Sequence, residues 1–177
     1  MRVADVCAAF WTYAKTTYPD PDYREGKRPK GELGNYWDVL RPLRRLYGET
    51  PAAEFGPVAL KAVRATMLKP RTVVDAKTGK VKRVPGWCRA VANRNVSRLK
   101  LIFRWAAEEE LVPGEVAARV WTVQGLRPGR SDARETEPVK PVPQEYVDAA
   151  LPHCSRQVQT MIKLQLLTGM RPGEAAA

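Results

Sequence analysis

The sequence predicts an all-α protein in which residues 1–130 form a bundle of four or five helices. Apolar residues recur at helical spacing in several stretches, and prolines and glycines separate these stretches from one another. Apolar residues also make up 44% of the 177 residues, which is enough to form a buried core. No uninterrupted run of about 18 apolar residues occurs, so we expect no membrane-spanning helix.

Helical periodicity is clearest in the first two thirds of the chain. Pro57 suits the first turn of a helix, whereas Pro42 lies inside a periodic stretch and predicts a kink or a late helix start. Residues 19–34 are rich in proline, glycine and charge, and this composition predicts a loop. The expected helices cover residues 3–17, 35–47, 57–68, 88–110 and the short segment 115–121.

The helix expected at 88–110 has the most regular pattern. Arg94 and Arg98 lie one turn apart on the side opposite its apolar face. Leu101 and Trp105 point away from that face as well, so we expect the second half of the helix to pack on two sides. The residues of the apolar face are Val96, Leu99, Ile102, Phe103 and Ala106.

The net charge of +11 is concentrated in one part of the chain. Residues 61–104 hold thirteen lysines and arginines and a single acid, Asp75, whereas the rest of the chain has a net charge of −1. Charge gathered in this way indicates a polyanionic partner. Within the segment, residues 71–84 place two basic, β-branched runs around Lys-Thr-Gly, which predicts a short β-hairpin. Its basic residues include Lys77, Lys80, Lys82 and Arg83.

The last third of the chain differs in composition. Residues 125–143 contain four prolines and many charges with few apolar residues, which is typical of a linker. Helices are expected at 144–151 and 156–167, and the second is apolar nearly all round, as in a helix at the centre of a domain. The chain ends ten residues after that helix, so we expect its covering elements to be missing.

Several kinds of site are disfavoured by the residue content. The three cysteines, Cys7, Cys88 and Cys154, are far apart and odd in number, which predicts neither disulfides nor a paired metal-ligand motif. His153 is the single histidine, so a multi-histidine metal site is excluded. The first residues do not resemble a signal peptide. We therefore expect a cytoplasmic protein without a metal, cofactor or small-molecule substrate.

The segment LQLLTGMRPGE, residues 164–174, resembles the first catalytic motif of tyrosine recombinases and phage-type integrases. In that family an apolar helix ends in a Thr-Gly turn, an arginine follows, and Pro-Gly-Glu or a similar sequence begins the next helix. Residues 94–113 resemble the last long helix of the family's N-terminal DNA-binding domain, and residues 134–143 resemble its interdomain linker. The resemblance implies a SAM-like core-binding domain at 1–130, a linker at 131–143 and the start of the catalytic domain at 144–177.

This resemblance implies a defined chemistry. A tyrosine of the family attacks a DNA phosphodiester without a metal or cofactor, and arginines stabilise the extra negative charge of the transition state. Arginine suits this task because its planar guanidinium binds two phosphate oxygens and stays charged. Arg171 would be the first catalytic arginine, and Glu174 would help to hold it.

Other functional residues of the family lie after the first arginine. They include a lysine, a histidine, a second arginine and the nucleophilic tyrosine, whereas only six residues follow Arg171 here. All six tyrosines and His153 precede Arg171. We therefore expect a truncated recombinase that is inactive alone.

Double-stranded DNA is the expected partner, together with other recombinase protomers in the intact protein. We expect the basic segment to lie along DNA phosphates. The residues expected to contact DNA are Lys82, Arg83, Arg89, Arg94, Arg98 and Lys100.

Two other classes of protein share some of these features. A free-standing DNA-binding regulator could use the same helical module, and an RNA-binding or ribosome-associated protein would share the high charge. The apolar helix at 156–167 disfavours a complete regulator, because it requires covering elements. RNA-binding proteins usually display aromatic residues on a sheet or have a glycine-rich loop, whereas Phe10, Trp11, Phe103 and Trp105 lie at helical spacing. DNA integration and recombination is therefore the leading interpretation, and the regulator is the alternative.

Overall fold

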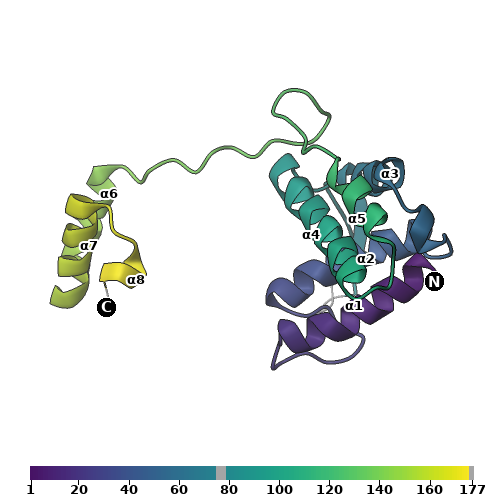
Figure 1. The fold of residues 1–177 in the computed structure, drawn as a ribbon. Coiled ribbons are helices and arrows are strands. Elements are labelled where there is room, and N and C mark those ends of the chain that lie inside the picture. Colours follow the sequence, from purple (N-terminus) through teal and green to yellow (C-terminus); the bar gives the residue numbers. More distant parts are fainter. Residues whose placement is uncertain (75–78, 176–177) are drawn as a thin grey trace. The chain divides into compact units, whose positions relative to one another are not determined.

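The computed structural model describes residues 1–74 and 79–175, which form two compact units, Met1–Thr136 and Glu137–Ala177. The described part is mostly helical, with a two-stranded antiparallel hairpin (Figure 1). The first unit contains α1 (Val3–Thr17), α2 (Gly31–Tyr47), η1 (Ala52–Glu54), α3 (Pro57–Leu68), β1 (Arg71–Val74), β2 (Val81–Val84), α4 (Arg89–Glu108) and α5 (Gly114–Trp121). The second contains α6 (Gln144–Ala150), η2 (Leu151–His153), α7 (Arg156–Thr168) and α8 (Pro172–Ala175).

Helix α2 is longer than its sequence pattern predicts. It begins at Gly31, because a carboxylate oxygen of Asp20 accepts the Lys30 backbone N–H at 2.7 Å and fixes the chain at the helix entry. It also continues through Pro42, although proline has no N–H to donate to the preceding turn. Leu40 and Leu43 are both buried on either side of this proline, so packing against the core holds the helix together.

The core of the first unit forms where α4 packs against the other helices. All five residues of its predicted apolar face are buried, which confirms that prediction. Phe103 stacks on Phe55, with ring centroids 4.4 Å apart, and Phe55 follows the η1 turn. On another side of α4, Trp105 packs against Phe10 and Tyr13 of α1, as expected for a helix that is covered on two sides.

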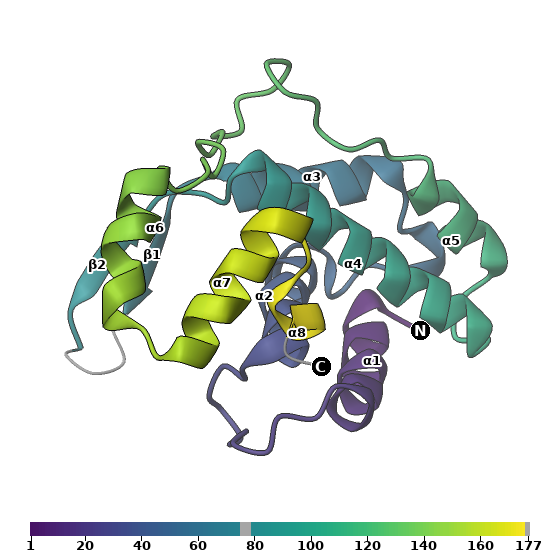
Figure 2. The same ribbon diagram turned by 90° about the vertical axis from the view of Figure 1, so that its left-hand side faces the viewer.

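The hairpin stands at the end of the first unit away from α5 (Figure 2). Its strands pair antiparallel with Arg71 opposite Val84 and Val73 opposite Lys82, so the predicted hairpin is present. The predicted turn residues Lys77 and Thr78 lie outside the described residues.

The segment predicted as a linker is partly folded onto the first unit. The Asn93 side chain donates to the Leu126 carbonyl at 3.0 Å and accepts the Leu126 N–H at 2.8 Å. Farther along, the Arg134 carbonyl accepts the Arg89 N–H at 2.9 Å, and Ala133 is buried. The first compact unit therefore extends to Thr136.

The second unit has little internal packing. No described residue after Ala133 is buried, and α7 exposes Leu164, Leu166 and Leu167. Within the second unit, the apolar surface of α7 is therefore uncovered. Among the residues that the structure describes, no helix is both long and apolar enough to cross a membrane.

Candidate nucleic-acid interface

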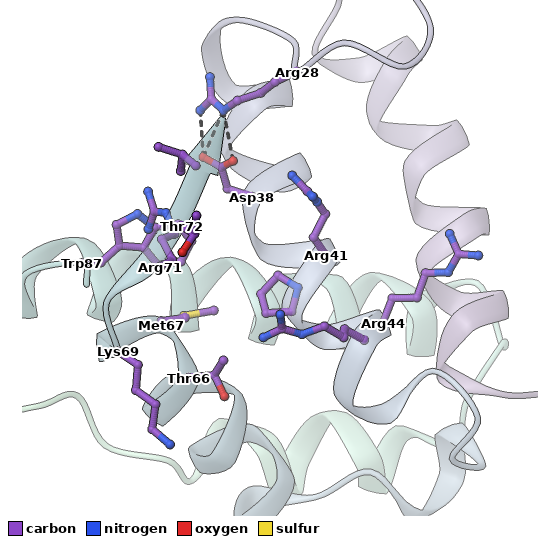
Figure 3. Close-up of a pocket in the computed structure, with 13 residues that line it drawn as sticks. Arg28, Asp38, Arg41, Arg44, Thr66, Met67, Lys69, Arg71, Thr72 and Trp87 are labelled. Atoms are coloured by element: carbon purple, nitrogen blue, oxygen red, sulfur yellow. Dashed lines mark hydrogen bonds and ion pairs between the residues drawn. The ribbon is translucent and has the colours of Figure 1, made fainter. Parts of the chain in front are cut away.

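A groove of about 1100 Å³ separates α2 from the end of α3 and the beginning of β1 (Figure 3). Cationic side chains line both of its walls, and Asp38 is the one acidic residue among the described residues that line it. The cationic residues of this basic groove are Arg28, Arg41, Arg44, Arg45, Lys69 and Arg71.

One wall of the basic groove is a face of α2. Arg41, Arg44 and Arg45 occur at positions i, i+3 and i+4, so they lie on neighbouring turns of the helix. All three are exposed, whereas the neighbouring Leu40 and Leu43 are buried in the core. The charge distribution along the sequence does not indicate these arginines, because acidic residues elsewhere in this region lower its net charge. Their helical spacing is the signal that could have identified them.

The opposite wall is held in place by the chain around the hairpin. The Met67 carbonyl near the end of α3 accepts the Trp87 N–H at 3.0 Å, which ties together the two ends of the segment that contains the hairpin. Gly86 allows this approach, because a Cβ atom there would lie 1.9 Å from the Leu68 carbonyl oxygen. This anchorage places Lys69 and Arg71 opposite α2.

Most cations of the basic groove have no acidic partner. Asp38 forms an ion pair with Arg28 at 2.8 Å, and this carboxylate raises the pKa of the Arg28 guanidinium. Within residues 1–74 and 79–175, no ion pair involves Arg41, Arg44, Arg45, Lys69 or Arg71. The groove therefore presents five uncompensated positive charges to solvent.

Three of the six residues predicted to contact DNA are also exposed. Lys82 and Arg83 lie on β2, and Arg94 lies on α4. None of them forms an ion pair with any residue in the described part of the chain. Their guanidinium and ammonium groups are available to an anionic partner.

Arg98 is instead part of a polar network between α2 and α4. Its Nε donates to one Glu32 carboxylate oxygen at 2.7 Å, and a terminal nitrogen donates to the other at 2.9 Å. A further nitrogen donates to Asn95 Oδ1 at 3.2 Å, and the Arg98 side chain is only 17% exposed. The Arg98 hydrogen bond is the main cause of the lowered pKa of Glu32, and Glu32 in turn raises the pKa of Arg98.

Arg89 and Lys100 also have partners inside the first unit. Arg89 pairs with Glu135 at 2.6 Å, on the docked segment that follows α5. The Lys100 ammonium donates to the Trp121 and Val123 carbonyls at 3.2 and 2.5 Å, where α5 ends. A cation at this position favourably meets the negative end of the helix dipole. Burial, followed by repulsion from Arg64, lowers the pKa of Lys100.

The turn that carries Arg171 has a well-defined backbone. Gly169 ends α7 with a φ of 70°, a left-handed conformation that favours glycine. The Thr168 hydroxyl donates to the Leu164 carbonyl at 2.6 Å and accepts the Met170 N–H at 3.3 Å. The predicted Thr-Gly break is therefore present.

The side chain of Glu174 contacts the backbone of Arg171. Its carboxylate accepts the Arg171 N–H at 2.8 Å, three residues earlier, in the manner of a helix-capping glutamate. Among residues 1–74 and 79–175, no ion pair involves the Arg171 guanidinium. Glu174 thus fixes the start of α8 and leaves the exposed arginine side chain available.

Comparison of this chain with protein-family models, curated proteins and solved structures gives no match.

Proposed function

We propose that residues 1–136 bind duplex DNA through the basic groove, and that the protein acts in site-specific DNA recombination of the tyrosine recombinase type. The observation that carries the DNA-binding part is the set of five uncompensated cations in the groove. Like charges held this close repel one another, and a polyanion relieves that repulsion while its condensed counterions are released.

The spread of these cations favours a nucleic-acid backbone over a small anion. They come from two walls, with Arg41, Arg44 and Arg45 on α2 and Lys69 and Arg71 on the other side. A row of phosphates can neutralise charges distributed in this way, whereas one small anion reaches only a few of them. The exposed residues Lys82, Arg83 and Arg94 extend the cationic surface of the same unit.

A duplex is favoured over single-stranded RNA by the packing of five aromatic residues of the first unit. Phe10, Tyr13 and Trp105 pack against one another, and Phe55 and Phe103 are buried. These rings support the core and do not form the stacking platforms that single-stranded RNA commonly requires. Binding through ion pairs with the sugar–phosphate backbone of a duplex is therefore favoured.

The recombinase part of the proposal rests on the α7–α8 turn. Gly169 reverses the chain, and Glu174 fixes the backbone of Arg171 without neutralising its guanidinium. A guanidinium presented in this way suits the charge that develops on a phosphate during strand cleavage. Arg171 is the proposed transition-state stabiliser, and Glu174 its positioning residue.

Duplex binding is tested with the full chain and a fluorescent duplex, by anisotropy across a series of salt concentrations. If about five phosphates are neutralised, the slope of log K against log salt is roughly −4 to −5. Replacing both Arg41 and Arg45 with alanine should make that slope shallower by about 1.8. The matched control replaces Arg127 and Arg130, two exposed arginines outside the groove.

Two outcomes would contradict this proposal. Equal losses in both double variants would show that overall charge, and not the groove, determines binding. Binding by the wild-type chain that does not depend on salt would exclude a phosphate-based interface altogether. Duplex RNA serves as the competitor, and a clear preference for it would reject the DNA assignment.

A further inference from the structure

One arginine of the basic groove differs from the others in how it is held. The Arg71 guanidinium lies over the Trp87 ring, with its central carbon 4.7 Å from the ring centroid (Figure 3). Arg41, Arg44 and Arg45 have no aromatic partner of this kind within the described residues. Arg71 is therefore fixed by a neighbouring side chain, whereas the α2 arginines are not.

The ring that holds Arg71 is itself firmly placed. Trp87 is partly buried and packs against the hydrophobic core of the first unit. Its backbone N–H is bonded to the Met67 carbonyl, and the adjacent Gly86 lies tightly against Leu68. The indole thus forms a rigid surface at the end of the groove.

This arrangement leaves the donors of Arg71 unused. A guanidinium stacked on an aromatic ring uses its flat face, and its N–H groups point outward in the plane. No carboxylate of the described residues accepts from Arg71. Stacking also covers that face of Trp87, so a nucleic-acid base does not stack there.

We infer that Trp87 is a positioning residue for Arg71, and that Arg71 presents a fixed, two-pronged donor to one DNA phosphate in the basic groove. This inference rests on the proposed DNA binding. Its physical basis is that a pre-oriented side chain loses less conformational freedom when a phosphate binds. A planar guanidinium also matches two phosphate oxygens at once, which an ammonium group does not.

A double-mutant cycle on the full chain tests the inference. The variants are Arg71→Ala, Trp87→Leu and the combination, and duplex binding is measured across a salt series. Arg71→Ala should make the salt slope shallower by about 0.9, the value for one phosphate. Trp87→Leu should weaken binding by about two- to tenfold, the usual cost of ordering one long side chain on binding, and leave the slope unchanged because no charge is removed. In the Arg71→Ala background, Trp87→Leu should have no further effect.

Conservative variants separate positioning from a purely structural role. Trp87→Phe retains an aromatic face and should restore most of the affinity lost in Trp87→Leu. Arg71→Lys keeps the charge and the slope but should lose affinity, because it cannot offer two parallel donors. The stability of each variant is followed in parallel by urea denaturation.

The outcomes distinguish this inference from the proposed function. If Trp87→Leu weakens binding equally with and without Arg71, the ring only supports the fold and the inference is wrong. An unchanged salt slope in Arg71→Ala would also overturn the inference. The proposed DNA binding would still stand in that case, provided that the wild type binds in a salt-dependent manner. Absence of salt-dependent binding by the wild type would reject both.

Discussion

Replacing Glu32 with glutamine should destabilise the first unit, because Glu32 is the partner of a mostly buried arginine. Arg98 donates to both Glu32 carboxylate oxygens, at 2.7 and 2.9 Å, and Asn35 donates to the same carboxylate at 2.8 Å. The Glu32→Gln side chain keeps the shape but removes the negative charge and one of the acceptors. Arg98 then remains in a mostly buried site without an ion-pair partner, and its acceptors are Asn95 Oδ1 and the single amide oxygen left at position 32.

The size of the effect follows from the burial of the pair. Exposed ion pairs contribute about 0.2–1 kcal/mol, whereas breaking a fully buried pair costs about 3–5 kcal/mol. The two side chains are 17% and 40% exposed, so solvent screens part of the interaction. We expect a loss of about 1–2 kcal/mol, between these limits and nearer the exposed one. For a unit of this size, that corresponds to a fall in Tm of about 3–7 °C.

The loss should depend on pH in a defined direction. The pKa of Glu32 in the folded protein is lowered, first by its hydrogen bond from Arg98 and against the opposing effect of burial. The pair therefore contributes its full stabilisation above the ordinary glutamate pKa of 4.5. That contribution decreases as the pH falls through the lower, folded value. The stability difference between wild type and Glu32→Gln should accordingly be largest near neutral pH and shrink below about pH 4.5.

Urea denaturation of the full chain, followed by tryptophan fluorescence, measures this difference. All five tryptophans precede Thr136, so the signal reports on the first unit. The matched control is Glu54→Gln, because Glu54 is exposed and has no ion pair among the described residues. Equal stability of wild type and Glu32→Gln at pH 7, or a difference that persists unchanged at pH 3, would refute the reasoning.

Three further predictions concern the groove, the core and the reaction. Asp38→Asn removes the acid that pairs with Arg28 in the groove, so duplex affinity measured by anisotropy should rise by about two- to fivefold. Weaker binding would mean that Arg28 must be held by Asp38 in order to contact DNA. Phe103→Ala removes a fully buried ring and should cost about 3–5 kcal/mol in urea denaturation, and a loss below 1 kcal/mol would contradict the observed packing. The chain alone should form no covalent adduct with nicked duplex substrates on denaturing gels, because the role proposed for Arg171 is charge stabilisation and a guanidinium is not a nucleophile. An adduct that disappears in Arg171→Ala, or in Tyr146→Phe, would disprove this.

The sequence by itself determined the features that depend on residues close to one another in the chain. Helical spacing predicted α1 and α3 at their observed bounds and identified the buried face of α4. The Thr-Gly pair predicted the turn at Gly169, because only local backbone conformation is involved. The basic hairpin at 71–84 was equally recognisable, since its two strands are adjacent in the chain.

Only the tertiary structure decided which cations remain uncompensated. Arg98 and Lys100 looked like surface cations in the sequence, but their partners come from Glu32 on α2 and from the carbonyls at the end of α5. The basic groove likewise combines α2 with β1, two elements that are separated in the chain by η1 and α3. The physical reason is that charge compensation acts through space over a few ångströms, and residues distant in sequence reach that separation only when the chain folds.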